Sequence, residues 1–146
     1  MSRVSELLRQ KPATVHSVRR DDTVRHAILT MTENDVGAVL VLEGDRIHGI
    51  FTERDVLRRV ALAGRSPGET RVHEVMTDRL VVLGPSTSVE DCMATMTRAR
   101  VRHLPIVDGA KLVGIVSIGD VVRHLSAERE IDLRYLTDYV LGRYPA

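Results

Sequence analysis

Apolar residues along the chain follow two periods, which predict alternating helices and strands. Spacings of three and four residues are typical of helices, and short continuous apolar runs are typical of buried strands. Helices are expected at residues 1–10 and 72–76, after Asp22, at 52–63, after Thr87 and after Ser117. Strands are expected at residues 14–18, 38–42, 47–51, 80–83, 104–107 and 112–116.

Polar residues at the borders of these elements predict caps and turns. Asp21-Asp22 is a candidate N-cap, and Thr87 with Glu90 matches a capping box. Turns at Glu43-Gly44-Asp45 and Asp108-Gly109 separate neighbouring apolar runs. Each pair of runs is therefore expected to form a β-hairpin.

One seven-residue stretch occurs twice in the chain. Gly49-Ile50-Phe51-Thr52-Glu53-Arg54-Asp55 returns 65 positions later as Gly114-Ile115-Val116-Ser117-Ile118-Gly119-Asp120. In both copies the end of an expected strand leads to a hydroxyl residue and, three positions later, to a carboxylate. The shift of 65 extends over the expected helices and strands, whereas residues 4–8 resemble residues 72–76 at a shift of 68. Two copies of one unit therefore fill nearly the whole chain.

The repeat predicts the fold class and the domain organisation. We expect an α+β fold of two β-α-β-β-α repeats at residues 1–65 and 71–125, joined by a linker at residues 66–70 and followed by a tail at residues 126–146. Two helices cannot cover both faces of a three-stranded sheet. The repeats are therefore expected to pack sheet to sheet with pseudo-two-fold symmetry and to leave clefts between them.

Composition and charge narrow the range of functions. The chain has 146 residues, 43% of them hydrophobic, with a net charge of +1, which argues against a nucleic-acid-binding surface. The single cysteine, Cys92, falls at an apolar helix position and is expected to be a buried thiol. No leader or apolar run of membrane-spanning length is apparent, so a soluble cytoplasmic protein without membrane contact is expected.

Signatures of catalysis or metal binding are weak in this sequence. The six histidines are scattered and no cysteine cluster accompanies them, so no metal site is expected. There is no phosphate-binding loop of the Walker type, and no nucleophile elbow surrounds a serine. We therefore expect a binding protein without catalytic residues or a catalytic cofactor.

The two Gly-hydrophobic-hydrophobic-Thr/Ser-x-x-Asp motifs resemble those of the tandem cystathionine-β-synthase (CBS) domain pair, or Bateman module. The run Arg102-His103-Leu104-Pro105-Ile106-Val107 and the matching helix starts at Val4 and Val72 extend the resemblance over roughly residues 4–125. The resemblance implies binding of adenosine-containing ligands in the clefts between the repeats, and association into a homodimer through helices. AMP is favoured, with ADP, ATP, NAD or S-adenosylmethionine as alternatives.

The same resemblance assigns roles to individual residues. Thr52, Asp55, Ser117 and Asp120 are expected to bind ribose, an assignment that suits a carboxylate because it can accept from two hydroxyl groups. The residues expected to bind adenine are Val15, Ser17, Ala38, Val39, Leu80, Val82, His103, Leu104 and Pro105. The residues expected to bind phosphate are Arg54, Arg102 and His103.

Two alternatives remain open at the sequence level. Thr or Ser followed three residues later by an acid is also an ordinary helix N-cap box, so the chain could be a ligand-free structural or protein-interaction module. The two copies also differ, since Arg54 corresponds to Gly119 and Leu40 to Pro105. Their clefts are therefore not expected to bind one ligand equally well, and the regulated protein is unknown.

The tail after Leu125 lies outside the repeat. Ser126 is a candidate cap for a helix whose apolar face carries Ile131, Tyr135, Leu136, Tyr139 and Val140. This helix is expected either to pack on its own module or to offer a surface to a partner.

Overall fold

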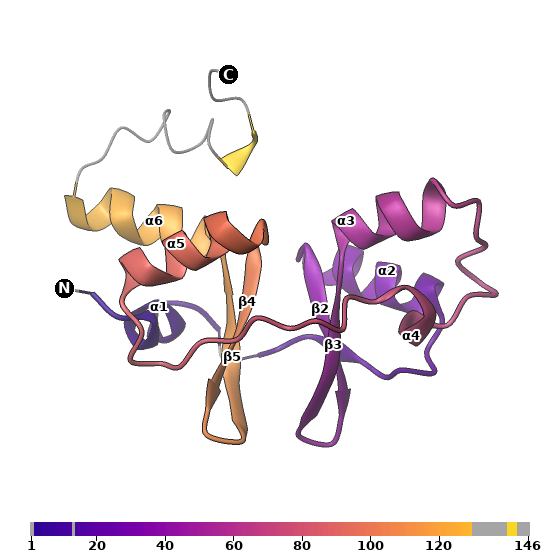
Figure 1. Cartoon of the computed structure of the whole chain (residues 1–146), viewed down its shortest axis with the longest axis horizontal. Coiled ribbons are helices and arrows are strands. Elements are labelled where there is room, and N and C mark those ends of the chain that lie inside the picture. Colours follow the sequence, from indigo (N-terminus) through magenta and orange to yellow (C-terminus); the bar gives the residue numbers. More distant parts are fainter. Residues whose placement is uncertain (1, 13, 130–139, 143–146) are drawn as a thin grey trace. The chain divides into compact units, whose positions relative to one another are not determined.

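The computed structural model describes residues 2–12, 14–129 and 140–142 and alternates short helices with short strands (Figure 1). The helices are α1 (Val4–Arg9), α2 (Val24–Asn34), α3 (Glu53–Asp55), the π-helix η1 (Val56–Ala61), α4 (Val72–Val75), α5 (Val89–Ala99) and α6 (Ile118–Arg129). The strands are β1 (Ser17–Val18), β2 (Ala38–Glu43), β3 (Arg46–Thr52), β4 (His103–Asp108) and β5 (Lys111–Ser117). This composition confirms the predicted α+β class with two repeats.

The chain forms two compact units that do not coincide with the two sequence repeats. One unit is Thr14–Leu80, and the other combines the N-terminal segment that carries α1 with the chain from Val81 onward. The predicted division at residues 66–70 followed the repeats, whereas the units divide near residues 13 and 80. The first unit will be called the Asp55 unit and the second the Asp120 unit, after the carboxylates that they contain.

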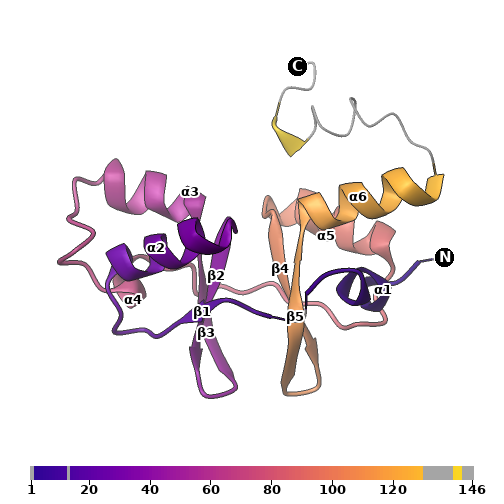
Figure 2. The ribbon, with the colours of Figure 1, turned by 180° about the vertical axis from the view of Figure 1, so that it is seen from behind.

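The division arises because the opening helix of each repeat packs on the other repeat. The Val4 N–H at the start of α1 donates to the Thr87 carbonyl at 2.8 Å, and α1 lies beside β5 and α6 (Figure 2). Correspondingly, the Val72 N–H at the start of α4 donates to the Asp22 carbonyl at 2.9 Å. The two helices thus occupy equivalent places in the two units.

Both predicted hairpins are present and share the same irregularity. Strands β2 and β3 pair antiparallel with Ala38 opposite Thr52, and β4 and β5 pair with His103 opposite Ser117. The turns contain Gly44 and Gly109, whose φ angles of 59° and 62° lie in the left-handed region that glycine tolerates. Each hairpin also has one register shift, between residues 41 and 42 and between residues 106 and 107.

The first strand of each repeat is shorter than predicted. Residues Ser17 and Val18 form β1, which pairs parallel with β2. In the second repeat the predicted strand at residues 80–83 is reduced to Leu83, which forms one parallel bridge with Ile106. Val81 and Val82 are exposed, because neither joins the ladder.

Each unit has a hydrophobic core of its own. In the Asp55 unit α2 contributes Ala27 and Met31, which pack with Val39 and Phe51 of the hairpin. In the Asp120 unit Cys92 takes the place that corresponds to Ala27, and its side chain is fully buried. The prediction of a buried thiol is therefore confirmed.

Three predicted helix starts were wrong in their details. The N-cap of α2 is Thr23, whose side chain accepts from the His26 N–H, and not Asp21-Asp22. The N-cap of α5 is Ser88, one residue beyond the predicted Thr87. Ser126 lies within α6, so its backbone N–H is part of the helix and it does not begin a new one. At α2 and α5 several small polar residues adjoin, and the one that adopts the extended cap conformation is not the one predicted.

The helix predicted for residues 52–63 begins after the cap Thr52 as expected, but after one turn it changes from an α-helix to a π-helix. Beyond α3 it continues as η1, in which the Leu62 N–H donates to the Leu57 carbonyl, five residues earlier. Of the predicted tail helix, residues 131–139 lie outside the described part of the chain. Val140 is described, and its side chain packs against the core of the Asp120 unit.

Candidate functional site

The carboxylate of Asp55 lies at the start of α3, where the sequence motif predicted a ribose site. Thr52 is the N-cap, and its hydroxyl accepts from the Asp55 N–H at 3.2 Å. In return, Asp55 Oδ2 accepts from the Thr52 N–H at 3.0 Å. This reciprocal capping box forms because β3 delivers Thr52 in an extended conformation directly into the helix.

Asp55 receives further donors from outside its own motif. The Thr77 hydroxyl lies 3.1 Å from Oδ1 and 3.3 Å from Oδ2 of Asp55. The Arg59 Nε lies 3.6 Å from Oδ1, beyond hydrogen-bonding distance, and the Arg59 guanidinium donates instead to the Met76 carbonyl. The Asp55 residue is only 5% exposed, so its carboxylate is held mainly by neutral donors in a buried setting.

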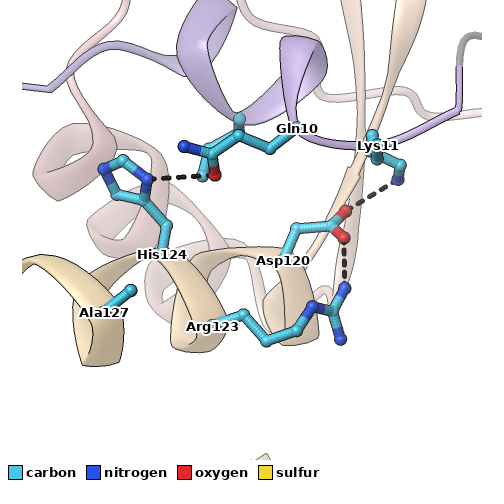
Figure 3. Close-up of a pocket in the computed structure, with 7 residues that line it drawn as sticks. Gln10, Lys11, Asp120, Arg123, His124 and Ala127 are labelled. Atoms are coloured by element: carbon cyan, nitrogen blue, oxygen red, sulfur yellow. Dashed lines mark hydrogen bonds and ion pairs between the residues drawn. The ribbon is translucent and has the colours of Figure 1, made fainter.

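The equivalent carboxylate, Asp120, lies at the start of α6. Its Oδ2 accepts from the Ser117 N–H at 2.8 Å, and the Asp120 N–H donates to the Ser117 hydroxyl at 3.2 Å. Two cationic side chains also contact the Asp120 carboxylate. Lys11 Nζ lies 2.7 Å from Oδ2, and Arg123 Nη2 lies 2.6 Å from Oδ1. Figure 3 shows these two side chains reaching the carboxylate from different elements.

The environment of Asp120 favours its ionised form. Burial opposes ionisation, but the hydrogen bonds from Lys11 and from the Ser117 backbone outweigh it, so the pKa of Asp120 is lowered. The carboxylate is therefore an obligate acceptor at neutral pH.

A cavity of about 490 Å³ adjoins Asp120. Its volume is within the range of small-molecule pockets. On one side of it the Gln10 side chain meets the His124 ring, with Oε1 and Nδ1 3.3 Å apart (Figure 3). The residues that line it are Leu7, Gln10, Lys11, Asp120, Arg123, His124 and Ala127.

Among the predicted adenine-binding residues of the Asp55 unit, Ala38 and Val39 lie on β2 and Ser17 lies on the neighbouring strand β1. Ala38 lies opposite Thr52 in the hairpin, and Ser17 lies opposite Leu40. The Val39 side chain is fully buried in the core of this unit, so it offers a ligand only backbone groups. Val15 is half-buried, as is Leu80 at the other end of the unit.

In the Asp120 unit the predicted adenine-binding residues begin β4. His103 lies opposite Ser117, and Pro105 is buried one residue beyond Leu104. The Leu104 side chain is a core residue with no exposed surface. Val82 lies in the exposed segment before Leu83.

The predicted phosphate-binding residues differ in the charge that they can supply. Arg54 and Arg102 are exposed, and both carry a full positive charge. Burial lowers the pKa of His103 to about 4, against a smaller opposing effect of Asp120. At neutral pH His103 is therefore a neutral hydrogen-bonding group and not a cation.

Sequence reasoning missed three residues that hydrogen-bond to the motif carboxylates, Thr77, Lys11 and Arg123. Thr77 lies 22 positions from Asp55 and Lys11 lies 109 positions from Asp120. The available signal was the three-residue length difference between the repeats, which falls in the segment that contains Lys11. That length difference marks the segment, but it does not reveal that Lys11 contacts Asp120.

The described part of the chain gives little support for a metal site or a reactive cysteine. Residues 2–12, 14–129 and 140–142 contain no group of three His, Cys, Asp or Glu side chains placed to hold a metal ion. Burial raises the pKa of the Cys92 thiol to about 11, an effect to which Asp120 adds, so the reactive thiolate is disfavoured. Among these residues no helix has the length and apolar character needed to cross a membrane.

Comparisons with known proteins agree with the repeat. The CBS domain family matches residues 4–62 and 72–127. The mitochondrial CBS domain-containing protein CBSX3 of Arabidopsis thaliana is 41% identical over 129 residues, covering 85% of this chain but only 63% of the relative. YhcV of Bacillus subtilis is 39% identical over 129 residues, which cover 88% of this chain and 89% of the relative.

A solved structure has the same fold. The CBS-domain protein of Burkholderia ambifaria MC40-6 is 45% identical and superimposes with a TM-score of 0.85, covering 90% of this chain and 98% of the other. Two family matches in tandem, the internal repeat and this similarity over nearly the full length lead to one assignment. The chain belongs to the CBS domain family and carries two copies of the domain.

Proposed function

We propose that this CBS pair is a regulatory module that binds an adenine nucleotide, with AMP favoured over ADP, ATP, NAD and S-adenosylmethionine. The observation that carries the proposal is the pair of matching buried carboxylates, Asp55 and Asp120, each at a helix start directly after a hairpin. The module acts by binding and not by turnover. The similar Burkholderia ambifaria protein, named as a candidate signal-transduction protein, is consistent with such a role.

The chemistry of the carboxylates suits ribose. An ionised carboxylate has two acceptor oxygens and no donor, so it complements the two neighbouring hydroxyl groups of a ribose. Each motif carboxylate is already oriented by backbone and hydroxyl donors, which lowers the cost of fixing it on binding. The buried setting strengthens any hydrogen bond that replaces a present one.

The base and the phosphate would be held by neighbouring groups. The backbone at Ala38 and Val39, together with Val15, Ser17 and Leu80, is proposed to contact adenine in one half. His103, Leu104, Pro105 and Val82 have the same proposed role in the other half. Arg54 and Arg102 are proposed to bind phosphate, and His103 would assist as a neutral donor.

The first experiment is a thermal-shift panel of the five nucleotides, followed by the variant Asp55→Asn. A nucleotide that binds the folded state raises the melting temperature with concentration. Asp55→Asn is expected to remove most of that rise, since the amide replaces one acceptor oxygen by a donor. The matched control is Asp91→Asn, because Asp91 occupies the same position after the cap of α5 but is exposed.

A second candidate function is a ligand-free interaction module, and one observation favours it. In both motifs the hydroxyl residue and the carboxylate already accept from each other's backbone N–H groups at the helix start. Thr52 with Asp55, and Ser117 with Asp120, form these bonds without any ligand. On this alternative no nucleotide raises the melting temperature. Thr52→Ala would then cost about 0.5–2 kcal/mol of stability, whether or not nucleotide is present.

Regulation would require a second protein or a change of association state. We propose that the module forms homodimers and that bound nucleotide stabilises one arrangement over another. Nucleotide can shift such an equilibrium only by its difference in affinity for the two arrangements.

A further inference from the structure

The two motif carboxylates occupy equivalent positions but accept from different kinds of donor. Asp55 accepts from the hydroxyl of Thr77, a neutral group, at 3.1 Å, and the Arg59 Nε lies 3.6 Å from its Oδ1 as an ion-pair partner. Asp120 instead accepts from the ammonium group of Lys11 at 2.7 Å and the guanidinium group of Arg123 at 2.6 Å. An arginine three or four residues later accompanies each carboxylate, so the two sites differ mainly in the second donor, which is a neutral hydroxyl at Asp55 and an ammonium group at Asp120.

Lys11 takes the place of Thr77 in the Asp120 unit. The Thr77 N–H donates to the carbonyl of Ile50 at 2.9 Å while its hydroxyl reaches Asp55. The Lys11 ammonium donates to the carbonyl of Ile115, the counterpart of Ile50, at 2.9 Å while also reaching Asp120. One charged side chain thus makes both contacts that a backbone N–H and a hydroxyl make in the Asp55 unit.

Lys11 is held more firmly than Arg123. The Lys11 side chain is 27% exposed and is fixed at two acceptors, whereas the Arg123 side chain is 74% exposed and reaches Asp120 from the next turn of the same helix. Arg123 can therefore turn into solvent at little cost. Lys11 cannot leave without exposing the Ile115 carbonyl and the buried carboxylate together.

A ribose hydroxyl competes poorly with this ammonium group. A hydroxyl and an ammonium group both form charge-assisted hydrogen bonds with a carboxylate, but only the ammonium group adds the attraction of an opposite charge. A ribose at Asp120 would replace an ion pair with a hydrogen bond from an uncharged hydroxyl and leave a part-buried ammonium group without its counterion. At Asp55 a ribose replaces a neutral hydroxyl with a neutral hydroxyl, which is an even exchange.

We propose that Lys11 is a built-in occupant of the Asp120 site, so that of the two sites proposed above only the Asp55 site takes adenine nucleotide while Lys11 is in place. This inference rests on the proposed function. It identifies Lys11 as the residue that sets the number of nucleotides bound per chain.

The test is the stoichiometry of binding, measured by isothermal titration calorimetry on the full chain with AMP and, separately, ATP as probes. Wild type is expected to bind one nucleotide per chain. Asp55→Asn is expected to weaken that binding by about 10–100-fold, the effect of losing a hydrogen bond to a charged group.

The decisive variant is Lys11→Met, which removes the ammonium group and keeps an unbranched apolar chain. It is expected to bind two nucleotides per chain, and the double variant Lys11→Met/Asp55→Asn is expected to bind one. The matched control is Lys111→Met, because Lys111 is exposed at the start of β5. This control is expected to behave as wild type, and circular dichroism establishes that each variant is folded.

Two other results have distinct meanings. If wild type binds two nucleotides and Lys11→Met weakens one of them, Lys11 is a ligand of the nucleotide and the inference is overturned, while the proposed function stands. If neither wild type nor Lys11→Met binds AMP, ATP or any other nucleotide of the thermal-shift panel, the proposed function fails and the inference fails with it.

Discussion

Gly49 and Gly114 are equivalent residues of the repeat that face different neighbours. A Cβ atom on Gly49 would lie 2.6 Å from the Thr77 carbonyl oxygen, whereas one on Gly114 would lie 2.8 Å from the Cδ2 of Leu8. A backbone oxygen in a paired segment cannot move aside, but the tip of a leucine can rotate. We therefore expect Gly49→Ala to destabilise the protein by about 1–3 kcal/mol and Gly114→Ala by clearly less.

Urea unfolding of the two variants beside wild type measures the difference. Equal losses of stability would show that Leu8 is as rigid as the backbone at Thr77. The two glycines occupy the same position in the sequence repeat. Their tolerance of a side chain differs only because different residues pack against them in the fold.

His103 makes stability depend on pH in a defined direction. Its pKa is lowered by burial to about 4 in the folded protein, compared with about 6.5 in an unfolded chain. Between these values the unfolded state binds the proton and the folded state does not, so stability falls as pH falls from about 6.5 to about 4. The contribution lost is at most about 3 kcal/mol, and no further loss from this residue is expected below pH 4.

The measurement is urea unfolding at several pH values, with His103→Gln as the comparison. The variant should lose less stability than wild type over this interval because it has no proton to take up. NMR titration of the His103 ring gives the folded pKa directly. A value near 6.5 would contradict the buried, neutral assignment.

At the scale of elements, α1 belongs energetically to the Asp120 unit although it opens the first repeat. Leu7 is 2% exposed and packs in the same core as Leu104 and Val116. Leu7→Ala is expected to cost about 2–5 kcal/mol and to raise hydrogen exchange in β4, β5 and α5. The Asp55 unit should show little change.

The matched variant is Val75→Ala in α4, because Val75 is equally buried but belongs to the core of the Asp55 unit. It should raise exchange in β2 and β3 instead. If Leu7→Ala affected β2 and β3 as strongly as β4 and β5, the assignment of α1 to the Asp120 unit would be wrong.

Local pattern predicted the elements well and their long-range partners poorly. Both hairpins and the caps of the motif helices follow from residues close together in the chain, so Thr52 could be placed as the start of a helix. The docking of α1 on the second repeat could not be predicted, because the repeat gives α1 and α4 the same local pattern. The Lys11 contact with Asp120 was missed for the same reason.

The π-helix illustrates a second limit of the sequence. Residues 52–63 have a pattern typical of a helix, but the choice between an α-helix and η1 depends on how the tertiary contacts of Val60 and its neighbours fix the turn. For the candidate site, the motif placed both carboxylates at helix starts. The donors that distinguish them came from elsewhere in the fold.

At the scale of the whole molecule, two exposed leucines, one in η1 and one directly after it, bear on the proposed homodimer. Leu57 is 67% exposed and Leu62 is 84% exposed. Burial of one such side chain in an interface contributes about 1.5–3 kcal/mol, whereas a glutamate in its place would have to be desolvated. The double variant Leu57→Glu/Leu62→Glu is therefore expected to be monomeric where wild type is dimeric.

Light scattering coupled to size-exclusion chromatography gives the mass of each species. The control is Val113→Glu, because Val113 is also exposed, at 42%, but lies in the hairpin strand β5 and not on a helix. This control should remain a dimer. A monomeric wild type would contradict the proposed homodimer. A dimeric double variant would show that Leu57 and Leu62 do not hold the interface together. We therefore expect the measured mass to fall from dimer to monomer only in the leucine double variant. The reason is that association would bury the apolar side chains that each chain otherwise exposes to water.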